Sequence, residues 1–403
     1  MAPQYSIARL RTNMPRDFWY LWQGQLVSQV GTQAFQVLAL FWMASHTHNA
    51  GAGALFLALS LLPPVIAGPY LARWSTKFAP RTVMVACDLL AATLALPVLI
   101  AVLLDASVPV VLAMMLVSNT LLAMTHALML PTVHAAIPTL VDGTSLKSAN
   151  GWMQTTQQVS TVVGQALGGI AYALIGPAGL CLVNMTGFAM SGLLARRMTS
   201  PGVCQVGAGQ PRGVAPWAML KSQSGLRNLT IVSAVFNVLY APWLVLLPFH
   251  LSATGSPSAG TMGLVLAAYG LGSLIGNLVL TRVIPGLASQ TLWKALIGMA
   301  LALLLLGQTN GALQTAMALL IMGAGIGWVN VQIMTKLQLS VAPELRAGAV
   351  AVMRSSVHLA TPFGYGVVAL AQHSLAWTPA LIFTGCGLVL LGALISLRSL
   401  LRE

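Results

Sequence analysis

The sequence contains little charge, and acidic residues are scarcer still. Of 403 residues, 19 are Lys or Arg and only 6 are Asp or Glu, and charged residues make up 6% of the chain. Soluble globular proteins carry roughly a quarter charged residues. Hydrophobic residues reach 57%, and the mean hydropathy is +0.83. This composition argues against a soluble fold and predicts a protein of the lipid bilayer.

Cysteines are few, and catalytic motifs are absent. Cys87, Cys181, Cys204 and Cys386 show no spacing typical of a metal site and no pair outside the membrane. The sequence has no Ser, His and acid constellation and no phosphate loop of the G-x-x-x-x-G-K-[ST] type. We therefore expect no enzyme activity, no cofactor, no metal and no direct use of ATP.

Apolar segments recur along the whole chain, and each is long enough to cross a hydrocarbon core of about 30 Å as a helix. Breaks at Gly, Pro, Asn and charged clusters divide them into twelve expected helices. Six lie near 18–44, 54–72, 82–104, 108–130, 150–175 and 177–195. Six more lie near 228–250, 260–281, 292–308, 312–335, 348–372 and 377–397. The predicted fold is an all-α, multi-pass membrane protein.

The basic residues all fall on one side of this expected topology. Loops on the opposite side, such as SHTHNAGAG and SATGSPSAG, contain no Lys or Arg. Positive charge of this kind marks cytoplasmic loops. We therefore expect both termini in the cytoplasm of a bacterium and the helices in its inner membrane. The net charge of +13 is interpreted as topology, and we expect no nucleic-acid partner.

The two halves of the chain are faintly repeated. AGPYLARW, at the end of the second expected helix, has a counterpart in YGLGSLIGNLVLTR at the end of the eighth, and TSLKSANG has one in PELRAGAV. Parallel repeats about an axis normal to the membrane leave this pattern. We predict an N-terminal six-helix bundle at 1–195, a cytoplasmic loop at 196–227 and a C-terminal six-helix bundle at 228–403. The substrate path is expected between the bundles.

Four fragments carry a family likeness in the right order. They are FWYLWQGQLVSQVG, GPYLARWSTKFAPRTVMVACDLLAA, IPTLVDGTSLKSANG followed by GQALGGIAYALIGPAG, and LQLSVAPELRAGAV. Together they resemble the major facilitator superfamily, and within it the drug-efflux branch that contains macrolide efflux pumps and the enterobactin exporter. The resemblance implies the twelve-helix major facilitator fold and export of a small molecule by alternating access. We expect the transporter to be a monomer.

One departure from the family pattern concerns the connection after the second helix. The family usually places an acidic residue before a basic one there, whereas this chain has Thr76 and Lys77. In the family that carboxylate helps to latch the cytoplasmic side. The remaining candidate is Asp88, about two turns beyond Arg81. We predict a gate that includes Asp88 and Lys77, with Arg73, Arg81 or a basic residue of the eleventh helix as the charge partner.

Titratable groups inside the membrane are few, although proton-coupled exporters usually need one. Of the six carboxylates, only Asp88 falls within an expected helix. The other candidates are His126 and His358, and His358 is a coupling candidate or else a hydrogen-bonded structural residue. Arg354 is either a cavity-facing substrate or gate residue or a positive anchor that reaches the cytoplasm.

Uncharged polar groups are more abundant. Gln25, Gln29, Gln33 and Gln36 recur every three or four residues, so they form one stripe along the first helix. An amide donates and accepts hydrogen bonds but does not titrate. The predicted substrate-binding set consists of these four glutamines with Gln158, Gln165, Asn237, Tyr240, Asn330 and Arg354. Hydrogen bonding between helices is the alternative role of the amides.

Strips of glycine mark two of the expected helices. They are Gly164, Gly168 and Gly169 in the fifth helix and Gly270, Gly272 and Gly276 in the eighth. Small residues at this spacing let helix backbones approach closely within a membrane. We therefore expect a packing role.

Two transport hypotheses follow. The first is export of an anionic chelator such as a siderophore, driven by membrane potential at about 2.3 kcal/mol per charge and 100 mV. The alternative is an antiporter that exchanges protons for a lipophilic drug such as a macrolide, with His358 or Asp88 carrying the proton. A third reading is a transporter-like receptor or lipid-handling protein that moves nothing across the membrane.

Overall fold

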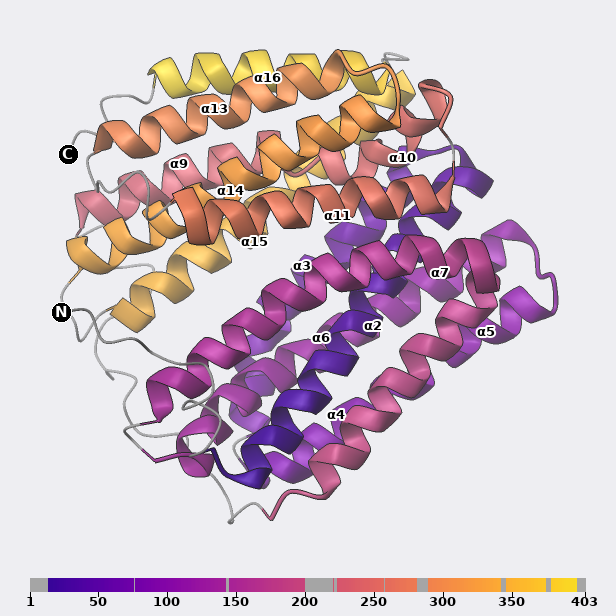
Figure 1. The fold of residues 1–403 in the computed structure, drawn as a ribbon, viewed down its shortest axis with the longest axis vertical. Coiled ribbons are helices and arrows are strands. Elements are labelled where there is room, and N and C mark those ends of the chain that lie inside the picture. Colours follow the sequence, from indigo (N-terminus) through magenta and orange to yellow (C-terminus); the bar gives the residue numbers. More distant parts are fainter. Residues whose placement is uncertain are drawn as a thin grey trace. The chain divides into compact units, whose positions relative to one another are not determined.

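The structure is a computed structural model that describes residues 14–75, 77–142, 145–199, 220, 223–256, 258–280, 289–341, 346–374 and 378–396. Helices and short connections make up all of this described part, which contains no strand. The all-α fold predicted from the composition is confirmed (Figure 1).

The described residues of the first half of the chain form six helices. They are α2 (Arg16–Thr47), α3 (Ala50–Ser75), α4 (Pro80–Leu94), α5 (Leu96–Leu103), α6 (Val108–Leu140) and α7 (Leu146–Arg196). α4 and α5 together cover the third expected span. The break between them at Ala95 precedes Pro97, whose ring nitrogen has no hydrogen to donate to the preceding turn.

α7 covers two expected spans in one 51-residue element. Its backbone leaves the helical region at Gly176, where φ is 66° and ψ is −175°. Glycine adopts this conformation without the clash that a Cβ atom causes, and Pro177 follows as a residue suited to a new helix start. The kink therefore lies at the predicted boundary between the fifth and sixth helices.

In the second half, the part of the chain that the structure describes forms eight helical elements. They are α9 (Ser224–Tyr240), α10 (Trp243–Ala253), α11 (Ala259–Ile275), η1 (Gly276–Leu280), α13 (Ser289–Gly307), α14 (Ala312–Ser340), α15 (Arg346–Ser374) and α16 (Pro379–Ser396). α9 and α10 divide the seventh expected span at Ala241 and Pro242. η1 continues directly from α11 as a short π-helix.

Nine helical segments of the described residues are long and apolar enough to cross a membrane, and Leu292–Gly307 is a shorter apolar helix. One of the nine, Ser148–Arg196, has 49 residues. A helix rises 1.5 Å per residue, so this segment is long enough for two crossings at its kink. The count of twelve crossings stays a prediction.

The chain divides into two compact units. One contains Met1–Leu38 and Ile66–Gly207, and the other contains Ala39–Val65 and Ala208–Glu403. Residues 39–65 thus group with the C-terminal helices, where Gly53 lies beside Val245 of α10. The bundle boundaries predicted at 195 and 228 stay a prediction.

Glycines set the packing within the first unit, where α2 contacts both arms of α7. A methyl group on Gly168 would lie 2.7 Å from the Ala34 Cα atom. On the other arm, Asn184 packs against Gly31 in the same close manner. The packing role predicted for this glycine strip is confirmed at Gly164 and Gly168, which both approach the α2 backbone.

Glycines of α11 and α14 interlock in the second unit, where the two helices run side by side (Figure 1). A methyl group on Gly272 would lie 2.0 Å from the Leu320 carbonyl oxygen. In return, a methyl group on Gly323 would lie 2.0 Å from the Tyr269 carbonyl oxygen. The glycine strip expected on the eighth helix, α11, therefore packs against glycines of the tenth helix, α14.

Candidate functional site

Asp88 is the one buried carboxylate among the acidic residues within the described ranges, with 2% of its surface exposed. It belongs to the buried face of α4, which also carries Val83, Met84, Cys87 and Ala91. These positions recur with the helical period, so the same pattern that buries the apolar side chains also turns Asp88 inward. The acid therefore lies in the interior of the first unit.

The partner of Asp88 is a serine from a distant part of the sequence. The Ser191 hydroxyl, on α7, donates to Asp88 Oδ2 over 2.7 Å. Gly24 of α2 faces this hydroxyl, since a methyl group there would lie 3.0 Å from Ser191 Oγ. A methyl group on Gly192 would lie 3.3 Å from Asp88 Cβ. Three helices thus meet at one hydrogen bond.

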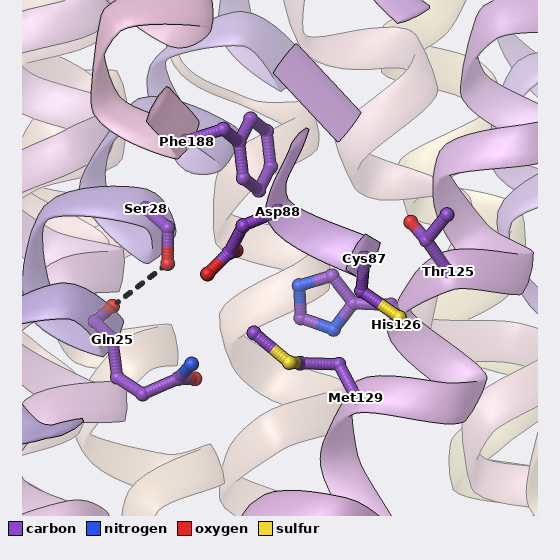
Figure 2. Close-up of a pocket in the computed structure, with 8 residues that line it drawn as sticks. All are labelled: Gln25, Ser28, Cys87, Asp88, Thr125, His126, Met129 and Phe188. Atoms are coloured by element: carbon purple, nitrogen blue, oxygen red, sulfur yellow. Dashed lines mark hydrogen bonds between the residues drawn. The ribbon is translucent and has the colours of Figure 1, made fainter. Parts of the chain in front are cut away.

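A small polar pocket opens beside this pair (Figure 2). Its lining residues come from four helices and are Gln25 and Ser28 of α2, Cys87 and Asp88 of α4, Thr125, His126 and Met129 of α6, and Phe188 of α7. Figure 2 shows the Asp88 carboxyl group and the Gln25 amide directed toward the same space. Among the described residues no Lys or Arg lines the pocket, and its described polar groups other than Asp88, Cys87 and His126 are uncharged at any pH.

The hydroxyl groups of the pocket bond to backbone carbonyls of their own helices. Ser28 Oγ donates to the Gln25 carbonyl over 3.3 Å, and Thr125 Oγ1 donates to the Leu122 carbonyl over 2.7 Å. Each hydroxyl donates its only hydrogen to a backbone carbonyl, and its oxygen lone pairs can still accept a hydrogen bond. Both side chains are available as acceptors for a proton-bearing group in the pocket.

The predicted glutamine stripe divides into two hydrogen-bonded pairs. Gln29 Nε2 donates to Gln25 Oε1 over 3.3 Å, and Gln165 Nε2 donates to Gln33 Oε1 over 3.4 Å. Gln25 and Gln165 are buried, whereas Gln29, Gln33 and Gln36 are half-buried. The first pair leads into the Asp88 pocket, and the second joins α2 to α7. The stripe therefore has accessible amides and also contributes to helix packing.

The remaining predicted residues of the first unit lie outside the pocket. Gln158 and Lys77 are exposed. The Arg81 guanidinium donates to the carbonyl of Arg196, the last residue of α7. In this structure Asp88 and Arg81 thus bond to different partners, because Arg81 lies two turns nearer the end of the bundle. The Arg73 side chain lies outside the described residues.

The predicted residues of the second unit fall into an exposed group and an aromatic one. Asn330, Arg354 and His358 are exposed, and the latter two lie one turn apart on α15. Asn237 is half-buried, and its Nδ2 atom donates to the Ser233 carbonyl over 2.8 Å. Arg354 and His358 are close enough to interact electrostatically, whereas no described contact joins either of them to Asn237 or Asn330.

Tyr240 is the centre of an aromatic cluster at the break between α9 and α10. Its hydroxyl donates to the Tyr269 hydroxyl over 2.9 Å. The rings of Phe236 and Tyr240 stack at 5.0 Å, and the rings of Trp243 and Tyr269 lie 4.7 Å apart. The cluster joins α9, α10 and α11 and presents a hydroxyl pair within an apolar surrounding.

Sequence reasoning missed Ser191 as the partner of Asp88. A single serine within an apolar helix gives no periodic signal, and its partner lies 103 residues away in the sequence. The glycines at 24 and 192 give only an indirect signal, since glycine inside a helix costs about 1 kcal/mol relative to alanine and therefore often marks a close contact.

The chain matches known transporters in sequence and in fold. The model of the Major Facilitator Superfamily matches residues 21–365. Macrolide efflux protein A of Streptococcus pyogenes is 22% identical over 273 residues, which are 66% of this chain and 67% of that protein. The resemblance predicted from the four fragments is confirmed at the level of the family.

Two solved structures share the fold. The nucleoside transporter NupG has a TM-score of 0.76 at 12% identity, over 95% of this chain and 99% of that one. A bacterial homologue of the iron transporter ferroportin, in an inward-facing state, has a TM-score of 0.72 at 16% identity, over 98% and 100%. At these identities the likeness shows the fold alone. The protein is a multi-pass membrane transporter and belongs to the Major Facilitator Superfamily.

Proposed function

We propose that this transporter exports a bulky lipophilic molecule in exchange for protons, and that Asp88 is the group that carries the proton. The observation that supports this most strongly is the burial of Asp88 in a polar pocket whose described lining contains no Lys or Arg. An ionisable side chain inside a membrane protein is costly, and such residues typically belong to ion or proton pathways.

The surroundings of Asp88 suit both protonation states. As a carboxylate, Asp88 accepts the hydrogen bond of Ser191. As a neutral acid it becomes a donor, and the lone pairs of Ser28 or the Gln25 amide oxygen offer acceptors within the same pocket. A site that satisfies both forms can bind and release a proton without leaving a buried polar group unpaired.

The proposed substrate class rests on the similarity to macrolide efflux protein A and on the polar groups of each unit. The first unit offers half-buried amides, Gln29, Gln33 and Gln36. In the second unit Tyr240 and Trp243 are buried, and Tyr269 is the half-buried member of their aromatic cluster. Amides bind hydroxyl and carbonyl groups, and aromatic side chains bind apolar surface. This combination favours a large apolar molecule with scattered oxygen atoms.

The siderophore hypothesis has less support. It rests on the absence of a carboxylate from the middle of the expected helices and on basic residues confined to one side, whereas the buried Asp88 favours the proton-coupled alternative. The exposed Arg354 and His358 keep an anionic substrate as the second candidate, which the following experiment separates from the first.

The experiment measures uptake of a radiolabelled macrolide into vesicles that contain the purified protein with its cytoplasmic side facing outward. We expect an acidic vesicle interior to drive uptake, because protons leave the vesicle in exchange for the drug. For a macrolide that carries one positive charge, exchange for one proton moves no net charge, so a voltage imposed without a pH gradient is expected to drive little uptake. Voltage-driven uptake of an anionic chelator, with no response to a pH gradient, would favour the siderophore hypothesis instead.

Replacement of His358 with Ala is expected to leave uptake driven by a pH gradient within about twofold of the native rate. His358 is exposed on α15, whereas the proposed proton carrier is Asp88. The measurement is the initial rate of macrolide uptake at several imposed pH gradients. If this variant lost its response to the pH gradient, His358 and not Asp88 would be assigned as the proton carrier.

Replacement of both Gln29 and Gln33 with Ala is expected to raise the KM for the substrate roughly tenfold. Each lost amide removes a hydrogen bond worth about 0.5–1.5 kcal/mol. Gln23 is the matched control, because it is an exposed glutamine on the same helix. An unchanged KM in the double variant would assign these amides to helix packing.

A further inference from the structure

We propose that Ser191 is a positioning residue that sets the pH range over which the transporter exchanges protons. This inference rests on the proposed role of Asp88. Ser191 lies on α7, donates to Asp88 Oδ2 over 2.7 Å, and has 2% of its surface exposed. It bonds to the carboxyl group and needs no contact with the substrate.

The hydroxyl of Ser191 is held by the helix backbones around it. Gly24 lies against Ser191 Oγ, Cα and O, so α2 closes one side of the serine. Gly192 lies against Asp88 Cβ and closes the other side of the pair. Side chains at either position would push the donor and the acceptor apart. The close packing at Gly24 and Gly192 therefore holds the Ser191 hydroxyl and the Asp88 carboxyl group at hydrogen-bonding distance.

The bond favours one protonation state of Asp88 over the other. A hydrogen bond to a charged carboxylate is roughly twice as strong as one between neutral groups. Ser191 Oγ can accept a hydrogen bond from the neutral acid, so the contact persists in both states. Because the charged form gains more, Ser191 eases release of the proton from Asp88.

Other titratable groups near Asp88 are few. Cys87 of α4 and His126 of α6 line the same pocket. α2 contributes Gln25 and Ser28 and α7 contributes Phe188 to this pocket, none of which titrates between pH 4 and 10. Of the pocket residues and Ser191, it is Ser191 that donates a hydrogen bond to the Asp88 carboxylate in the structure.

The test compares the pH dependence of macrolide exchange in Ser191→Ala with that of the native protein, in vesicles with equal pH on both sides. We expect the pH of half-maximal exchange to rise by about one unit, the size expected for loss of one hydrogen bond to a charged group. Gly24→Ala should shift it in the same direction, because its methyl group would crowd the Ser191 hydroxyl.

Ser160→Ala is the matched control. Ser160 is a fully buried serine of α7 whose hydroxyl donates to the Leu26 carbonyl of α2 over 3.4 Å, so it joins the same two helices without contacting Asp88. Its profile should match that of the native protein. His126→Gln removes the imidazole of the pocket. Adding Ser191→Ala to this variant should still shift the pH of half-maximal exchange.

Two failures are distinguishable. If Asp88→Asn transports as well as the native protein under a pH gradient, the proposed function is wrong. If Asp88→Asn loses the response but Ser191→Ala keeps the native pH profile, only the role of Ser191 is overturned. An equal shift in Ser160→Ala would also overturn it, because the effect would then come from helix packing.

Discussion

Asp88→Asn is expected to abolish uptake driven by a pH gradient, down to the level of vesicles without the protein. An asparagine has nearly the same shape and can still accept the Ser191 hydrogen bond over the distance of 2.7 Å seen in the native protein. It does not bind a proton, so proton movement down the gradient is no longer coupled to substrate uptake. Exchange of labelled for unlabelled substrate, which needs no net proton movement, is expected to persist.

The control for this variant is Asp105→Asn. Asp105 is an exposed carboxylate at the end of α5, with a positive φ of 46° in a turn. The same chemical change is made there, outside any pocket, and Asn tolerates the left-handed conformation well. Uptake by this variant should equal that of the native protein. Gradient-driven accumulation by Asp88→Asn at the native rate would contradict the assignment.

Gly323→Ala is expected to produce the second large effect, on stability and on the aromatic cluster. The added methyl group would lie 2.0 Å from the Tyr269 carbonyl oxygen, a backbone atom that cannot rotate away. Alanine gains about 1 kcal/mol over glycine in helix propensity, whereas overpacking costs about 1–3 kcal/mol and more where backbones must separate. The net result is destabilisation, with α11 displaced from α14.

The matched control is Gly298→Ala on α13. No atom lies within 4 Å of a methyl group at that position, so only the favourable propensity term applies. The measurement is thermal unfolding in detergent, where Gly323→Ala should unfold several degrees below the native protein and Gly298→Ala at or slightly above it. Equal unfolding temperatures for both variants would contradict the close packing of these helices.

Much of the fold was predictable because it depends on local patterns. The boundary near 176 followed from a Gly-Pro pair, and the structure places the kink of α7 there. The glycine strips of the fifth and eighth helices indicated close packing, which Gly168 and Gly272 confirm. The sequence also placed Asp88 within an expected helix, and the structure adds that its side chain is buried.

The partners of these residues were less predictable, because they depend on contacts between distant segments. Apart from the indirect signal of the adjacent Gly192, the sequence around Ser191 does not identify it as the serine that bonds to the carboxylate, and Ser160 bonds to a backbone carbonyl instead. Arg81, one of three alternative charge partners predicted for Asp88, donates to a backbone carbonyl at the end of α7. Backbone carbonyls at helix ends lack partners within the helix, and they leave no residue signal in a sequence.

The most direct test of proton exchange through Asp88 is a measurement of proton movement itself. Purified protein is placed in vesicles that contain a pH-sensitive dye, with equal pH on both sides, and a macrolide is added outside. The account predicts that the drug enters as protons leave, so the interior becomes more alkaline with the native protein and not with Asp88→Asn. Drug entry without any change of interior pH in the native protein would contradict it.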